Sequence, residues 1–460
     1  HARFSFDEVH GFFGVHVNPG DTVTIENNGV ELALDFVELE NVPAPIPQPE
    51  NSISITDSAY GAEDGQDSTV AFEKALKAAI EQKKTLYIPV GEFKINKKID
   101  FTADGLTVTG AGMWYSKLNF TTNEKGGGGF EIGHNSNRLT FSNFAMTSAL
   151  TSRYDHLDDK AQYKAFAGSF GKDSRIDHMW IEHFECGAWI GDYDTKMKYT
   201  DHLVIENSRI RNNLADGVNF TQGTRNSVVR NSNIRNNGDD SLATFSSSIH
   251  TNVYAENNSF EHNTIELGWR AGGVGIFGGK NHKVTNNLIK DSRGGAGIRV
   301  STVFANEGFG LGFDDNNEIL IKDNMIVNSG TTNDFYWPHS KPRSNIDFEE
   351  TFGPIKGITV QNNVFVNPVY TDEAITHSGV ELDGKVKIID SKVQGNTSSD
   401  PYKVDASMSH SVENGKEVYN FTYGNQPTFL PENSTAFERD YNYRGEREVD
   451  GHILRFWEHK

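Results

Sequence analysis

Two stretches of the chain decide its fold: NSRIRNNLADGVNF (Asn207–Phe220) and NSNIRNNGDDSLAT (Asn231–Thr244). Both begin with Asn-Ser, place an isoleucine in the fourth position and continue through Arg-Asn-Asn. Copies of this six-residue unit follow at steps of 24 to 39 residues, beginning at Asn257, Asn286, Asp323, Asn362 and Asp390. A repeat of this length is typical of a stacked solenoid rather than of a compact globular domain.

The repeat predicts an all-β fold, a right-handed parallel β-helix of the pectin-lyase-like kind with three short strands in each coil. The apolar residue of each unit points into the cylinder, and the asparagine before it occupies a turn, where left-handed dihedrals are tolerated. The longer steps predict inserted loops, such as Val303–Asn317 and Gly330–Gly353, that wall a cleft. The Leu-x-x-Leu-x-Leu pattern of the competing leucine-rich solenoid is absent from the sequence.

The regions that flank the repeat have a different pattern. Residues 1–45 alternate apolar and polar side chains, which predicts a small N-terminal portion of an antiparallel β-sandwich. Three or four strands are too few to close a sandwich. We therefore expect them to pack against the next domain or against an upstream part of the protein. We assign residues 46–400 to the β-helix, with a capping helix over Val70–Gln82. Residues 401–460 are expected to form C-terminal strands that pack on it.

The composition limits the partners of the chain. Its 460 residues carry a formal net charge of −20, which disfavours nucleic acid, acidic lipids and a polyanionic substrate. The single cysteine, Cys186, cannot form an internal disulfide, and we interpret it as a small buried apolar residue. The sequence has no run of 18 apolar residues, so we expect no membrane span. It begins at His1 without a signal peptide, which fits a processed chain.

The register of the repeat places carboxylates side by side. Asp216 lies nine residues after Asn207 and Asp240 nine residues after Asn231, so the two occupy the same place in adjacent coils. Adjacent strands lie about 4.8 Å apart. Asp239 directly precedes Asp240. The sequence therefore predicts a cluster of three aspartates.

The same count from Asn257 adds Glu266 to this strip as a fourth carboxylate. Repulsion among stacked like charges raises at least one pKa, which leaves a protonated acid beside ionised neighbours. Glycoside hydrolysis requires this mixture of a proton donor and a carboxylate. A calcium site and plain polar turns are the alternative interpretations of the cluster.

Six segments, in order over about residues 50–395, point to a known family: GAGMWYSKL (Gly110–Leu118), WIEHFECGAWI (Trp180–Ile190), ADGVNFTQGTRNS (Ala215–Ser227), RNNGDDSLA (Arg235–Ala243), GIFGGKNHKVTNNLIKDS (Gly275–Ser292) and AGIRVSTVF (Ala296–Phe304). Together they resemble glycoside hydrolase family 87, the α-1,3-glucanases (mutanases) and mycodextranases. The first 45 residues are similar to the closing strands of the sandwich that precedes the β-helix in that family.

The resemblance implies an inverting hydrolysis of an α-1,3-glucan, with Asp239 as the general acid. It implies that Asp216 and Asp240 hold and deprotonate the water. It implies no catalytic metal or other cofactor, while a structural calcium ion in the sandwich is compatible with it. A secreted bacterial enzyme that works as a monomer is expected.

Sugar sites need aromatic platforms and hydrogen-bonding side chains as well as catalytic acids. For each lone tryptophan or arginine, packing or a surface ion pair is the alternative role. We expect substrate contacts from Asn219, Glu266, Trp269, Arg270, Lys280, Arg299 and Trp337. The sequence departs from the family in LATFS, which ends at Ser246 and stands where an Ala-Met-Trp type of stretch is expected, and in Arg299.

Four functions remain open on the sequence. The first is endo-hydrolysis of an α-1,3-glucan, and the second is hydrolysis of a related neutral glucan, such as nigeran or dextran, at the same site. A polyuronate lyase would need calcium or a basic cluster, for which Lys280 and Arg299 are the candidates. A polysaccharide-binding β-helix without catalysis would leave the aspartates dispensable.

Overall fold

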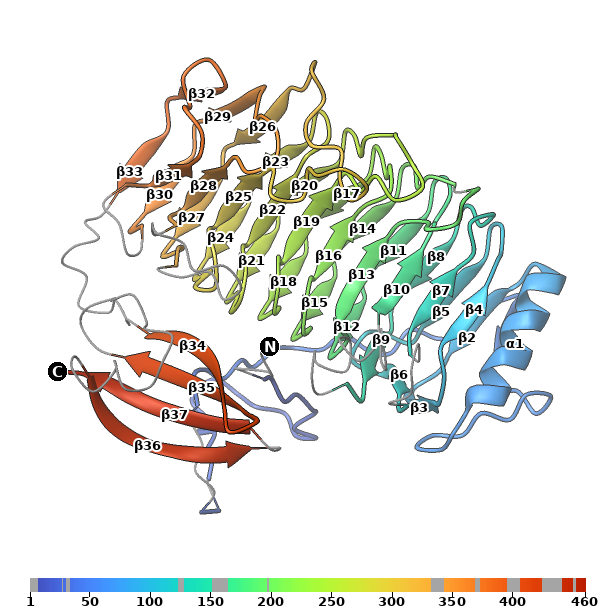
Figure 1. Ribbon diagram of the computed structural model, residues 1–460. Coiled ribbons are helices and arrows are strands. Elements are labelled where there is room, and N and C mark those ends of the chain that lie inside the picture. Colours follow the sequence, from blue (N-terminus) through green and yellow to red (C-terminus); the bar gives the residue numbers. More distant parts are fainter. Residues whose placement is uncertain are drawn as a thin grey trace.

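A computed structural model of the chain describes residues 7–26, 28–29, 34–122, 128–150, 164–196, 198–331, 343–368, 373–394, 406–423, 441–449 and 452–460. Three parallel sheets, A, B and C, run beside one another, and successive strands step from one sheet to the next (Figure 1). This arrangement confirms the predicted parallel β-helix.

Sheet A consists, in spatial order, of β1 (Ser52–Ser54), β2 (Thr85–Ile88), β5 (Thr107–Gly110), β8 (Thr140–Ser142), β11 (Arg175–Asp177), β14 (Val204–Glu206), β17 (Val228–Arg230), β20 (Ser259–Glu261), β23 (Lys283–Thr285), β26 (Ile319–Lys322), β29 (Ile358–Gln361) and β32 (Val386–Ile389). Sheet B consists of β3 (Gly91–Ile95), β6 (Ser116–Phe120), β9 (Ala145–Ser148), β12 (Trp180–Glu182), β15 (Arg209–Arg211), β18 (Asn233–Arg235), β21 (Thr264–Glu266), β24 (Leu288–Lys290), β27 (Met325–Val327), β30 (Val364–Val366) and β33 (Lys392–Gln394). Sheet C consists of β4 (Ile99–Phe101), β7 (Phe130–Ile132), β10 (Lys164–Gly168), β13 (Cys186–Ile190), β16 (Val218–Phe220), β19 (Leu242–Phe245), β22 (Val274–Phe277), β25 (Ile298–Ser301), β28 (Ile346–Glu349) and β31 (Ile375–Ser378).

The helix α1 (Thr69–Gln82) covers the N-terminal end of the stack, as the sequence predicts (Figure 1). It buries one apolar face, and Phe72 stacks on Phe130 of the first coils with ring centroids 5.8 Å apart. Further phenylalanines continue these ring contacts along the axis. Phe130 contacts Phe141 with ring centroids 5.7 Å apart, and Phe141 contacts Phe166 at 4.9 Å. The interior of the first coils is therefore aromatic.

Asparagines form two kinds of contact at the bends. Asn207 and Asn231 adopt left-handed dihedrals, with φ of 50° and 48°, as expected from their place before a strand. Serines follow these two bends, but at several other bends the next residue is a buried asparagine that donates its amide to the equivalent asparagine of the next coil. The Nδ2–Oδ1 distances are 3.2 Å from Asn263 to Asn287 and 3.0 Å from Asn287 to Asn324. This ladder satisfies polar groups that the stacked bends bury.

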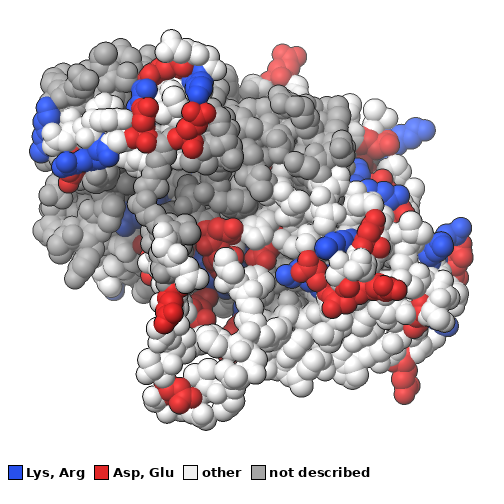
Figure 2. Space-filling model, turned by 90° about the horizontal axis from the view of Figure 1, so that it is seen from below, with Lys and Arg blue, Asp and Glu red and all other residues white. Residues whose placement is uncertain are grey.

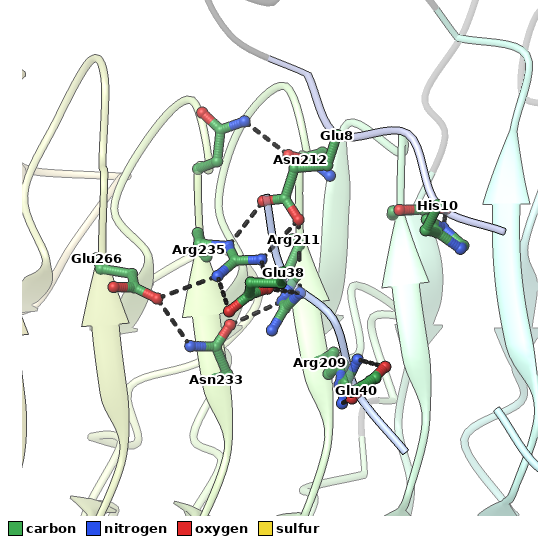
Figure 3. Close-up of polar contacts among 12 residues, drawn as sticks. Glu8, His10, Glu38, Glu40, Arg209, Arg211, Asn212, Asn233, Arg235 and Glu266 are labelled. Carbon is green, nitrogen blue, oxygen red and sulfur yellow. Dashed lines mark hydrogen bonds and ion pairs between the residues drawn. The ribbon is translucent and has the colours of Figure 1, made fainter. Parts of the chain in front are cut away.

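The N-terminal segment differs from the expected sandwich. Within residues 7–26, 28–29 and 34–50, the described backbone contains no strand and no helix. Instead, acidic side chains reach arginines on the outer face of sheet B (Figure 3): Glu8 and Glu38 bind Arg235 at 2.7 and 2.9 Å, and Glu40 binds Arg209 at 2.8 Å. An alternating pattern makes strands only where a neighbour offers hydrogen bonds, and here its acidic positions face sheet B.

The C-terminal residues form a separate four-stranded sheet. Its strands, in the order β34-β35-β37-β36, are β34 (Ala406–Glu413), β35 (Lys416–Tyr423), β37 (His452–His459) and β36 (Tyr441–Val449). Trp457 is buried there and donates from Nε1 to Asn420 Oδ1 at 2.9 Å. The expected packing of this region on the β-helix stays a prediction. Among the described residues, none of the helices has the length and apolar character needed to cross a membrane.

Candidate active site

The three predicted aspartates meet at the edge of sheet C. Asp216 lies two residues before β16, and Asp239 and Asp240 lie three and two residues before β19, its parallel neighbour in the next coil. One carboxylate oxygen from each residue lies within 4.8 Å of the other two. We call these three residues the aspartate trio.

Each member of the trio accepts a hydrogen bond that orients it. Asn219 Nδ2 donates to Asp216 Oδ2 at 3.0 Å. The backbone N–H of Gly272 donates to Asp240 Oδ1 at 3.0 Å. Arg270 Nη1 lies 2.5 Å from Asp239 Oδ2. Two of these donors, Asn219 and Arg270, are residues predicted from the sequence to contact the substrate; the structure places them beside the trio, and their contact with a substrate stays a prediction.

The outward positions of sheet C form a row beside the trio. Strand pairing places Trp189, Asn219, Ala243, Gly275 and Arg299 in register, one from each successive coil. The smallest side chains, at Ala243 and Gly275, stand at the level of Asp240, and larger ones stand on both sides. The row thus has its smallest residues at the level of the trio, and it follows the direction in which the coils stack.

A pocket of about 480 Å³ lies between Asp216 of the trio and the N-terminal coils. Its lining includes Asp216, Trp189, Tyr193, Lys164 and Glu185. Its volume and its mixture of aromatic and polar groups are typical of ligand sites. The last four residues were not predicted from the sequence; the in-register position of Trp189 next to Asn219 was the available signal.

Buried charges in this pocket compensate one another. Lys164 Nζ lies 3.1 Å from Glu185 and 5.7 Å from the centre of the Trp189 ring. Burial is the largest single influence and by itself lowers the pKa of Lys164, but the charge and hydrogen bond of Glu185, together with Cys186 and Tyr193, outweigh burial and raise this pKa. Cys186 is buried as predicted, and burial, followed by the charge of Asp216, holds the pKa of its thiol well above the usual range.

Glu266 does not lie with the trio, contrary to the register count. It ends β21 in sheet B, where its carboxylate lies 2.9 Å from Lys290. The same carboxylate lies 3.4 Å from Arg235 (Figure 3). The count failed because the six-residue unit occurs twice in a coil. Asn257 precedes a strand of sheet A, whereas Asn207 precedes a strand of sheet B.

The other predicted contact residues lie in several places. Trp269 packs on Gly238, the residue before the trio's second member, and Arg299 continues the row on sheet C, with its guanidinium paired to Glu349 and 5.6 Å from the Phe277 ring. Lys280 lies beside sheet A, 3.7 Å from Asp314. Trp337 lies outside the described residues.

One of the two predicted loops is described throughout. Residues 303–317 connect β25 to β26 and pack Phe304 and Phe309 against Phe245, with centroid distances of 5.7 and 5.3 Å. Phe304 also contacts Phe277, at 5.0 Å. The loop therefore builds an aromatic wall over the ends of β19 and β22. The departure from the family at LATFS places Phe245 in this wall.

The spacing of the three carboxylates would also allow the trio to hold a cation. Among the described residues, no other group of three or more His, Cys, Asp or Glu has this spacing. Acidic clusters of this size also occur without any ion, and Arg270 already supplies a positive charge at Asp239. Two expectations from the sequence stay predictions: that catalysis needs no metal, and that a calcium ion in the sandwich is possible.

The comparisons with known proteins agree with this geometry. The family described as alpha-1,3-glucanase catalytic domain D2 matches residues 66–390. The crystal structure of the Agl-KA catalytic domain is 43% identical, with a TM-score of 0.68, and the match covers 77% of this chain and 60% of that one. A search of curated proteins found no match.

Two further solved structures share the fold. The catalytic unit of a thermostable GH87 α-1,3-glucanase from Streptomyces thermodiastaticus strain HF3-3 is 26% identical, with a TM-score of 0.57 over 78% of this chain and 73% of that one. A GH87 α-1,3-glucanase catalytic domain bound to tetrasaccharides is 24% identical, with a TM-score of 0.61 over 76% and 60%. This chain thus spans about 60% of the Agl-KA catalytic domain. Because the family match covers most of its length, the chain belongs to the catalytic domains of the family 87 α-1,3-glucanases.

Proposed function

We propose that this chain hydrolyses the glycosidic bonds of an α-1,3-glucan. The observation that carries the proposal is the aspartate trio, which unites three carboxylates from two adjacent coils within 4.8 Å. Family membership supports the same reaction, and related GH87 α-1,3-glucanase domains have been solved with nigerose and with tetrasaccharides.

In the proposed mechanism, Asp239 donates a proton to the glycosidic oxygen as the bond to the anomeric carbon breaks. Asp216 and Asp240 hold a water molecule, and one of them takes its proton as the water oxygen attacks that carbon from the opposite face. The spacing of the trio supports the location of this site. In the distant relative, single alanine replacements were made at three aspartates, two adjacent and the third 23 residues earlier, and Asp216 precedes Asp239 by the same interval.

Inversion is the part of this proposal that needs its own test. Carboxyl groups in most inverting enzymes lie about 6.5–9.5 Å apart, and those in retaining enzymes about 5–5.5 Å apart. The trio is closer to the second case. We favour inversion because a third carboxylate lets two members hold the water while one serves as the acid. NMR of the first product formed decides it: a β-anomer supports inversion and an α-anomer refutes it.

A polymer chain would run along the row of sheet C. The pocket beside Asp216 offers Trp189 as a platform for a sugar ring, and Lys164 and Glu185 as partners for hydroxyl groups. Because the row continues on both sides of the trio, sugar units would lie on both sides of the cleavage point, and we propose cleavage within the chain rather than only at its end.

We further propose that the protein acts outside the cell as a monomer on a neutral polysaccharide. The net charge of −20 disfavours nucleic acid and polyuronates. On the face drawn in Figure 2, lysines and arginines lie among aspartates and glutamates rather than in one basic field. Sedimentation of the purified protein tests the monomer, and detection in culture medium tests secretion.

The experiment for the activity measures reducing-sugar release from α-1,3-glucan, nigeran, dextran and polygalacturonate. Wild type is run beside Asp239→Asn and beside Asp201→Asn, a control that removes a carboxylate bonded to Asn226 at the bend before sheet A rather than at the bend before sheet C. Release from α-1,3-glucan that is lost only in Asp239→Asn supports the proposal. Release from another polymer alone, or activity that survives Asp239→Asn, refutes it.

A further inference from the structure

Arg270 reaches the aspartate trio from the coil that follows Asp239. Its Nη1 donates to Asp239 Oδ2 at 2.5 Å and to the carbonyl oxygen of Gly238 at 3.2 Å. The Arg270 side chain is 6% exposed. One buried nitrogen therefore fixes both the carboxyl group of Asp239 and the backbone directly before it.

The backbone around Arg270 is held from both neighbouring coils. On one side, Trp269 donates from Nε1 to the carbonyl oxygen of Asn236 at 3.3 Å, and its ring leaves no room for a Cβ at Gly238, which would lie 2.2 Å from it. On the other side, a Cβ at Gly294 would lie 2.1 Å from the Arg270 nitrogen. Close packing on both sides holds the guanidinium in one place relative to Asp239.

We propose that Arg270 is a positioning residue for Asp239, acting on the acid rather than on the sugar. It directs the carboxyl group of Asp239 toward the glycosidic oxygen. The inference rests on the proposed function, in which Asp239 donates the proton. An arginine suits this role because its planar group makes two directed bonds at once, which the point charge of lysine does not reproduce.

A substrate that needs no proton on its leaving group separates this role from a general structural one. Fluoride leaves without protonation, so α-nigerotriosyl fluoride requires the water-activating carboxylates but not the acid. The experiment measures kcat and KM on α-1,3-glucan oligosaccharides and on this fluoride. The variants are Arg270→Met, Arg270→Lys and Asp239→Asn, with thermal unfolding of each recorded.

We expect Arg270→Met to lower kcat on the glucan about 10²–10³-fold, with KM changed little, because a displaced acid loses most of its contribution. On the fluoride, kcat should fall less than about 10-fold, as it should for Asp239→Asn. Arg270→Lys should recover part of the loss, and it keeps the test available where the methionine variant does not fold. The matched control is Arg230→Met, which removes an arginine bonded to Glu206 at 2.7 Å on sheet A and should leave both rates unchanged.

Two results overturn the inference. One is a wild-type kcat on the glucan in both Arg270 variants, and the other is an equal loss on glucan and fluoride in folded protein, which marks a structural role. A wild-type enzyme without activity on either substrate refutes the proposed function itself, and the inference with it. The two failures are therefore distinguishable.

Discussion

Replacing Gly275 with alanine should push Asp240 out of place. A Cβ at Gly275 would lie 2.9 Å from both Cγ and Oδ2 of Asp240 and 2.6 Å from the Phe277 ring. Ordinary contact of a Cβ begins at 3.4 Å. The carboxyl group must therefore retreat by about 0.5 Å and the ring by about 0.8 Å, as differences from these values.

Displacements of this size have known costs. A misplacement of about 1 Å in a catalytic group lowers the rate by as much as 10²-fold. Extra volume in a packed region costs about 1–3 kcal/mol of stability. For Gly275→Ala we expect kcat on α-1,3-glucan to fall about 10–100-fold, KM to change less, and the free energy of unfolding to fall by about 1–3 kcal/mol.

Steady-state kinetics and denaturant unfolding measure these effects, and Gly297→Ala serves as the control. Its Cβ would lie 2.5 Å from Ile326 Cγ2 and 2.7 Å from the Asn345 carbonyl oxygen, inside the coil and away from the trio. It should lose similar stability and keep its kcat. A stable Gly275→Ala with wild-type kcat, or an equal loss of kcat in both variants, contradicts the reasoning.

Three further predictions concern other parts of the molecule. Asn287→Ala should lower the free energy of unfolding by about 1–3 kcal/mol, because it leaves ladder groups unpaired; unchanged denaturation refutes this. Cys186 should react with thiol reagents at pH 8 only after unfolding, since burial raises its thiol pKa; rapid labelling of native protein would be the opposite result. Hydrogen bonds from Arg235 and Arg209 lower the pKa values of Glu38 and Glu40, so their contribution is complete above about pH 4.3 and is lost as pH falls further. Proteolysis of the N-terminal segment should then accelerate, and an unchanged cleavage rate would contradict it.

Much of the fold could be predicted because the residues of the repeat reflect the backbone dihedrals at the bends of each coil. Asparagine tolerates the left-handed turn before a strand, so units such as that at Asn231 mark the coil bends. Equal spacing from such a bend also placed Asp216 and Asp240 together. The prediction for Glu266 failed because two bends of one coil carry the same unit, and the sequence does not say which sheet follows each.

Contacts between distant segments were beyond reach of the sequence. The alternation in residues 1–45 predicts strands, but pairing between Glu8 and Arg235 depends on how two segments 227 residues apart meet. Likewise, Arg270 lies on Asp239 only because of a bend in the following coil. Periodicity reports the face on which a residue lies, not the partner that it meets there.

The asparagine ladder and the aromatic stack couple each coil only to the coils on either side of it. Thermal unfolding should therefore begin at one end of the stack and proceed coil by coil. The first coils are closed by α1, whereas Ile388 and Val393 in the last strands are 49% and 57% exposed. Opening should begin at β32 and β33 and travel inward, so hydrogen exchange there precedes exchange around the trio. On warming, the last coils should thus unfold before the structure around the aspartate trio does.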